Sequence, residues 1–182
     1  MNTTEFLMIS AAIVPDRTAV IFEDRRVTFE QMQARANRLA NALADHGVGP
    51  GDRVAILEVN TDRYVEAYFA TAKLDAIFVP LNFRARAEEL AYMINDSTPK
   101  VVIAGPRYEA LVKSFAGDVE CVDHYLSLEG EIEGWLSYES ITSAASEDEF
   151  LFPEAGDEDV SVLMFTAGTT GFPKGVMLTH ES

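Results

Sequence analysis

A short segment of the sequence, FTAGTTGFPKG, combines the residue types that bind phosphate. Its glycines let main-chain N–H groups converge on an anion, because no Cβ blocks the approach or forbids a positive φ. Thr166, Thr169 and Thr170 add hydroxyl donors, and Lys174 adds a mobile point charge suited to phosphate oxygens. The apolar run VSVLMF precedes the segment and predicts a buried strand over 160–165. We therefore expect a phosphate-binding loop directly after a strand.

The spacing excludes two common phosphate loops. A Walker loop has Lys and then Ser or Thr directly after its second glycine, whereas Lys174 is followed by Gly175. The dinucleotide pattern G-x-G-x-x-G is absent around Gly168 and Gly171. A loop rich in Gly and Thr is by itself more often a simple turn. We also expect a helix to start near 175–179, where its N-terminal dipole would attract an anion.

Composition narrows the class of protein. The chain has 182 residues, 48% of them apolar, which suits one domain or one lobe of a larger domain. The net charge is −16, and every Lys or Arg except Lys174 lies at or before Lys113, so nucleic acid is a poor partner. The single cysteine, Cys121, excludes an internal disulfide, fits a reducing compartment and is expected to be a buried apolar residue.

The N-terminal apolar stretch does not look like a secretory signal. It follows Glu5 rather than basic residues and is closed by Pro15, so we expect an amphipathic first helix. No apolar run approaches the roughly 18–20 residues that cross a bilayer. We therefore expect a cytoplasmic protein.

Alternating helices and strands predict an α/β fold. Thr28 and Gln31 form a capping box for a helix that ends at Gly47, and Asn60 or Thr61 can cap a second helix. Further helices are expected over 87–95, 107–115 and 138–145, and strands over 54–57, 76–80, 100–105 and 119–122. Strands separated by helices indicate βαβ units around a mainly parallel sheet.

The pattern weakens from Ser127 to Asp159. We expect an α/β subdomain over about 1–126, an acidic surface connection over 127–159, and the strand, phosphate loop and start of the next helix over 160–182. Trp135 and Tyr138 are expected to be packing residues. Two pairs of charged side chains, Asp62 with Glu66 and Arg84 with Arg86, are expected to be solvated surface charge.

The segment FTAGTTGFPKGVMLTH resembles the phosphate-loop signature of the adenylate-forming (AMP-binding) enzymes, which include acyl- and aryl-CoA synthetases, luciferases and peptide-synthetase adenylation domains. Ala167 stands where a serine is usual. VTFEQMQARANRLANAL and GVGPGDRVAIL are similar to the family's early helix and to the turn and strand after it. AKLDAIFVPLNFRARAEELAYMINDS resembles the second signature of the acyl-CoA synthetase branch, with Asp75 in place of a usual glycine.

This resemblance implies a two-step ligation. A carboxylate attacks the α-phosphate of ATP, and a thiol, usually that of coenzyme A, then displaces AMP. The residues that would bind the ATP phosphates are Thr166, Ala167, Gly168, Thr169, Thr170, Gly171 and Lys174. Lys174 would act catalytically by neutralising phosphate charge, and Thr166 would help to hold Mg²⁺. His180 matches the family's LTH, but we expect it to cap a helix or to pack rather than to catalyse.

Members of this family are longer proteins of two domains. We therefore expect the chain to be the N-terminal part of the large domain of an acyl-CoA synthetase that acts on a fatty acid or a similar carboxylic acid. We expect this part to be inactive by itself. An alternative is a naturally short, non-catalytic module of the same fold that binds nucleotide or a partner. A homodimer is left open.

Overall fold

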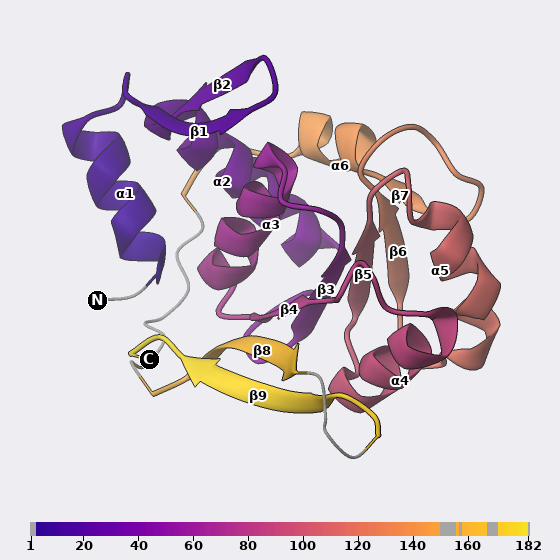
Figure 1. The fold of residues 1–182 in the computed structure, drawn as a ribbon. Helices are drawn as coiled ribbons and strands as arrows, with labels where there is room; N and C mark the ends of the chain where they lie inside the picture. Colours follow the sequence, from indigo (N-terminus) through magenta and orange to yellow (C-terminus); the bar gives the residue numbers. More distant parts are fainter. Residues whose placement is uncertain (1–2, 150–155, 157, 167–170, 182) are drawn as a thin grey trace.

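A seven-stranded sheet lies between two layers of helices (Figure 1). The computed structural model describes residues 3–149, 156, 158–166 and 171–181. The α-helices are α1 (Thr3–Ile13), α2 (Phe29–Asp45), α3 (Asp62–Lys73), α4 (Ala87–Ser97), α5 (Glu109–Phe115) and α6 (Tyr138–Ala144), with a 3₁₀ turn at Ala116–Asp118. The strands are β1 (Thr18–Phe22), β2 (Arg25–Thr28), β3 (Arg53–Leu57), β4 (Ile77–Pro80), β5 (Val101–Ala104), β6 (His124–Ser127), β7 (Leu136–Ser137), β8 (Val160–Thr166) and β9 (Lys174–Thr179).

The strand order of the large sheet is β7-β6-β5-β3-β4-β8-β9, and all neighbours are parallel except β8 and β9. Crossover helices link parallel strands because the chain must return to the same edge of the sheet before each new strand. The carboxyl ends of β3, β4, β5 and β8 therefore meet at one edge of the sheet. The α/β class with a mainly parallel sheet is confirmed.

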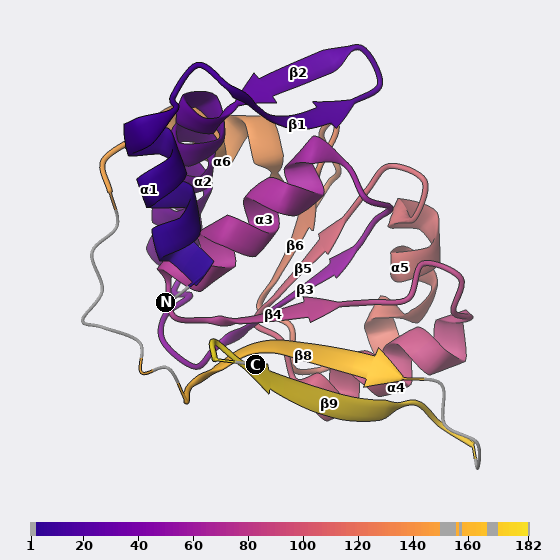
Figure 2. The same cartoon turned by 60° about the vertical axis from the view of Figure 1, so that its left-hand side comes forward.

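The central strands are apolar throughout because both faces of the sheet are covered. Val54 and Ile56 of β3 pack in a cluster with residues of α2, α3 and α6. Ala55 and Leu57 point the other way and pack with residues of α4 and α5. Figure 2 shows α4 and α5 on the opposite side of the sheet from α2 and α3.

Local signals placed two helix starts correctly. The capping box is formed, since Gln31 N donates to Thr28 Oγ1 over 3.2 Å and Thr28 N donates to Gln31 Oε1 over 3.0 Å. Thr61 rather than Asn60 caps α3, through a 3.1 Å bond from Tyr64 N to Thr61 Oγ1. Both caps satisfy N–H groups that the first turn of a helix leaves unpaired.

Several sequence-based expectations were wrong. The strand expected over 119–122 lies at His124–Ser127, where it pairs with β5 from Val101 to Ala104. Helix α1 is not amphipathic, because its own apolar side chains lie on all sides of the helix. Leu7 is its one buried residue. The hairpin of β1 and β2, a separate two-stranded sheet, was missed.

The segment over 127–159 is more than a surface connection at its start. Strand β6 ends at Ser127 and so runs across the expected boundary after residue 126, and β7 joins the edge of the large sheet. Tyr138 of α6 is 5% exposed and packs in the cluster under α2 and α3, as expected of a packing residue. The division into 1–126, 127–159 and 160–182 stays a prediction.

Asp62 and Glu66 are not solvated charge. Both side chains are fully buried, and Arg35 of α2 makes an ion pair with each of them. Their face of α3 turns toward α2 and β2, so arginines rather than water surround the two carboxylates.

Candidate functional site

The predicted phosphate loop connects the two strands of an antiparallel hairpin. Strand β8 follows the direction of β4, with Val162 opposite Phe78, and so carries Thr166 to the carboxyl edge of the sheet. In open α/β sheets, ligands bind outside this edge. The chain then returns as β9, whose first residue is Lys174.

The helix expected near 175–179 is absent from this place, and β9 occupies it. The six residues of β9 pair with β8 over almost the whole length of both strands, from Thr166–Lys174 to Val160–Thr179. Backbone pairing with a preformed strand satisfies the N–H and C=O groups that a helix would satisfy internally. The residues after the loop therefore offer no helix dipole to an anion.

Thr166 and Lys174 lie directly opposite each other across the hairpin. Directly opposed residues point to the same face of a sheet, with Cβ atoms about 4.5–5.5 Å apart. Thr166 Oγ1 donates a 3.4 Å hydrogen bond to the main-chain oxygen of Lys174. Both residues are exposed, and in the described part of the chain Lys174 makes no ion pair. The hairpin thus brings a hydroxyl and a free ammonium group together at the mouth of the loop.

The face that carries this pair is open because strand residues alternate. Val162 packs in the cluster of α2 and α3, while Leu163 and Phe165 pack toward α4 and α5. Beyond Val162, Met164 and Thr166 on its face are exposed.

The second arm of the loop is anchored by contacts that the sequence did not reveal. The ring of Phe172 stacks on Tyr92 of α4, with centroids 4.6 Å apart. Gly175 lies so close to the α4 side of β8 that an added Cβ would be 3.1 Å from Leu163 Cδ1. Gly171 has a φ of 136°, a conformation that favours glycine. Phe172 stands at the variable position of the motif, so no local signal pointed to it.

Four of the predicted phosphate-binding residues, Ala167, Gly168, Thr169 and Thr170, lie outside the described residues. The described positions on either side of them, Thr166, Gly171 and Lys174, are the ones that the structure places.

The far end of the hairpin lies near the start of α1 and the turn that follows α3. His180 is in a turn rather than at a helix end, and its Nδ1 is 3.5 Å from Thr3 Oγ1. Asp75 has a φ of 52°, the left-handed region that explains why glycine is usual there. Burial raises the pKa of Asp75, with Asp159 adding to the rise and His180 opposing it.

The fold and sequence match known proteins along the whole chain. The profile of the family described as "AMP-binding enzyme" matches residues 8–182. A long-chain-fatty-acid–CoA ligase of Mycobacterium tuberculosis, FadD13, is 36% identical over 100% of this chain and 36% of its own length. A long-chain-fatty-acid–CoA ligase of Thermus thermophilus is 34% identical over 100% of this chain and 34% of its own length.

Solved structures agree. The anthranilate CoA ligase AuaEII in complex with anthranoyl-AMP superposes with a TM-score of 0.95 at 29% identity, covering 100% of this chain and 35% of that one. The chain thus spans about a third of the length of the relatives it matches. Sequence, fold and hairpin agree that the chain belongs to the AMP-binding enzyme family.

Proposed function

We propose that this chain is the N-terminal, phosphate-binding part of an AMP-forming acyl-CoA ligase that adenylates a carboxylic acid of fatty type. The observation that carries the proposal is the opposition of Thr166 and Lys174 at the carboxyl end of β8. The relatives support the class of substrate, since they are named as ligases for long-chain fatty acids and, in other cases, for feruloyl or anthranilate groups.

Each loop residue has a role in this proposal. The Lys174 ammonium binds β- and γ-phosphate oxygens and offsets the negative charge that grows on pyrophosphate as it leaves. The Thr166 hydroxyl turns from the main-chain oxygen of Lys174 to a phosphate oxygen. The remaining contacts come from Ala167, Gly168, Thr169, Thr170 and Gly171, mainly through main-chain N–H groups.

Among the described residues, the side chain of Thr166 is suited to act as one protein ligand of Mg²⁺. No group of three or more His, Cys, Asp or Glu side chains converges among the described residues. Thr166 Oγ1 is a hard oxygen ligand, and Mg²⁺ typically keeps substrate phosphates and waters as its other ligands. When bound, the ion neutralises phosphate charge.

The wider assignment follows from the same proposal. The complete ligase would take ATP, a carboxylic acid and coenzyme A, act in the cytoplasm and have no nucleic acid partner. No helix in the described ranges combines the length and apolar character that a membrane span requires. The 182-residue chain alone would be inactive, because it covers about a third of its relatives' length.

The test is ATP–pyrophosphate exchange by the complete protein that carries this chain, screened across carboxylic acids. Lys174→Ala should lower the exchange rate by roughly 100-fold or more, the usual effect of removing a group that stabilises transition-state charge. Lys113→Ala is the matched control, because Lys113 is an exposed lysine on α5. Equal rates for the two variants would contradict the role of Lys174.

A second measurement addresses the chain alone. We expect weak binding of ATP with Mg²⁺ that is lost in Lys174→Ala, and no release of pyrophosphate. If the complete protein exchanged pyrophosphate with none of the carboxylic acids tested, that result would instead favour the non-catalytic module.

A further inference from the structure

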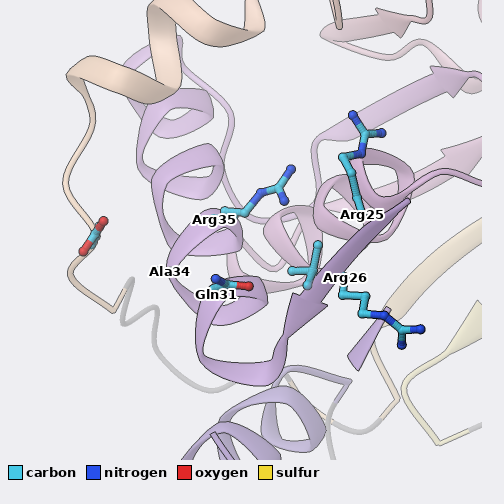
Figure 3. Close-up of a pocket in the computed structure, with 7 residues that line it drawn as sticks. Arg25, Arg26, Gln31, Ala34 and Arg35 are labelled. Atoms are coloured by element: carbon cyan, nitrogen blue, oxygen red, sulfur yellow. The ribbon is translucent and has the colours of Figure 1, made fainter. Parts of the chain in front are cut away.

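A pocket of about 480 Å³ lies between β2 and the first half of α2. Strand β2, which borders the pocket, lies at the opposite end of the molecule from the β8–β9 hairpin (Figure 1 and Figure 2). Figure 3 shows its lining residues, which are Arg25, Arg26, Val27, Gln31, Ala34, Arg35 and Glu147. Three arginines and one acid line this pocket, although the chain as a whole carries a charge of −16.

Two of the guanidinium groups are fixed by one buried carboxylate. Arg25 Nη2 lies 2.7 Å from Asp62 Oδ1, and Arg35 Nη2 lies 3.3 Å from Asp62 Oδ2. Arg35 also pairs with Glu66, and the Asp62 and Glu66 side chains are both 0% exposed. A carboxylate without exposed surface is unavailable to a ligand, so its role is to hold the arginines.

The same arginines keep a free side toward solvent. The Arg25 side chain is 48% exposed and that of Arg35 is 33% exposed. Arg25 contacts Asp62 through Nη2, and in the part of the chain that the structure describes its Nε and Nη1 have no hydrogen-bond partner. The Arg25 guanidinium also lies 5.3 Å from the ring centroid of Phe22. These contacts hold the guanidinium in place before any ligand arrives.

Asp62 and Glu66 offset the charges of Arg25 and Arg35, so the other polar lining residues decide the net charge of the pocket. Figure 3 shows the Arg26 side chain directed away from Arg25 and Arg35, so it adds positive potential at the rim rather than a contact. Gln31 Oε1 is occupied by the bond from Thr28 N, which leaves the amide NH₂ group of Gln31 as a donor. The negative charge of Glu147 lowers the positive potential of the pocket, although Glu147 is paired with Arg38 outside the pocket.

We propose that this pocket binds a small oxyanion, a phosphate monoester or a carboxylate, through Arg25 and Arg35. A guanidinium presents N–H donors in a planar fork that matches the oxygens of both groups. Because Asp62 already fixes the two forks, binding orders few additional side-chain torsions. The site is separate from the phosphate loop and does not depend on the ligase assignment.

The test is an NMR titration of the isotope-labelled 182-residue chain with inorganic phosphate, and in parallel with acetate, at constant ionic strength. We expect saturable shifts of the main-chain amides of Arg26, Val27 and Gln31. Saturation by phosphate alone or by acetate alone identifies the class of oxyanion, and saturation by neither overturns the proposal. The same titration in Lys174→Ala should leave these shifts unchanged, which separates the pocket from the phosphate loop.

Substitutions that remove a positive charge and a negative charge should change the affinity for the oxyanion in opposite directions. Arg25→Gln should weaken binding roughly tenfold, the effect of losing a hydrogen bond from a charged group. Glu147→Gln should strengthen it, because the opposing charge at the pocket is removed. Arg84→Gln is the matched control, since Arg84 is exposed on the loop before α4.

The variants must be folded for the comparison to count. Asp62 keeps Arg35 as a partner in Arg25→Gln, so we expect an unchanged circular dichroism spectrum. If that variant unfolds, Arg26→Gln replaces it, because Arg26 has no ion-pair partner among the described residues and should weaken binding severalfold. Equal affinities for the pocket variants and Arg84→Gln would overturn the proposal.

Discussion

Phe172 of the predicted phosphate loop stacks on Tyr92 of α4, with the two rings inclined by 26° and their centroids 4.6 Å apart. Phe172 is nonetheless 61% exposed. The contact therefore buries little apolar surface and acts mainly to hold the arm of the loop that leads to Lys174.

Removing this ring should affect nucleotide binding more than stability. We expect Phe172→Ala to weaken binding of ATP with Mg²⁺ by the complete protein up to about tenfold, because an aromatic pair contributes about 0.5–1.5 kcal/mol. Its unfolding midpoint in urea should barely move. Phe83→Ala, which removes another exposed ring outside the hairpin, is the control. An unchanged affinity in Phe172→Ala would show that the loop is held by other contacts.

The ion pair of Lys73 and Glu149 fixes the segment after α6 to the helical layer. The Lys73 side chain is 1% exposed, and Glu149 also accepts hydrogen bonds from Gln33 and Asn37. Burial lowers the pKa of Lys73, and the bond to Glu149 opposes that effect. Loss of the carboxylate would leave a buried ammonium group without its partner.

We therefore expect Glu149→Gln to lower the free energy of unfolding at neutral pH by about 2 kcal/mol, less than for a fully buried pair because Glu149 is 28% exposed. The pKa of Lys73 should fall further in this variant. The unfolded state then binds more protons than the folded state, so the stability of the variant should rise with pH in the alkaline range. Urea unfolding at neutral and alkaline pH measures both effects. Glu139→Gln, at an exposed partner of Arg63, should cost less than about 1 kcal/mol.

Asp75 follows the end of α3 in a left-handed conformation. Asp75→Gly should raise the free energy of unfolding by about 0.5–1 kcal/mol, because glycine adopts this conformation without strain. Removal of a carboxylate that is disfavoured by burial and by Asp159 acts in the same direction. Asp75→Ala removes the same charge but keeps a Cβ, so it should be less stable than Asp75→Gly. Thermal unfolding of the two variants would contradict this account if alanine proved the more stable.

Two tyrosines with buried hydroxyl groups give a matched test of hydrogen bonding. Tyr138 Oη donates to Glu66 Oε2, whereas Tyr125 Oη is buried and has no hydrogen-bond partner among the described residues. Tyr138→Phe should cost about 1–3 kcal/mol because it leaves the carboxylate oxygen unsatisfied, and Tyr125→Phe should be neutral or slightly stabilising. Equal losses in chemical denaturation would contradict this assignment of hydrogen bonds.

The loss in Tyr138→Phe should also depend on pH. Burial raises the pKa of Glu66 above its ordinary value of 4.5, and the bond from Tyr138 opposes that rise. Without the bond, the pKa of Glu66 rises further, so the charged form becomes less favourable in the folded state. The difference in stability between the variant and the wild type should therefore shrink as pH falls toward 4.5.

Local patterns predicted much of the fold. The capping box at Thr28, the cap at Thr61 and the apolar run of β3 each depend on residues that are neighbours along the chain. The loop motif likewise predicted that Thr166 and Lys174 act together. Such signals can be read in the sequence because a cap or a strand face is specified within a few residues.

Tertiary contacts decided the rest. The residues after Lys174 form a strand because β8 offers its free edge, and the apolar pattern of GVML suits a strand as well as a buried helix. Asp62 and Glu66 are buried because Arg25 and Arg35, distant in sequence, supply the opposite charges. The stacking of Phe172 on Tyr92 is likewise a meeting of two segments far apart along the chain. The sequence by itself therefore predicted which residues could bind phosphate, and the tertiary structure decided that Thr166 and Lys174 face each other, because strand pairing and charge burial depend on partners that no local pattern specifies.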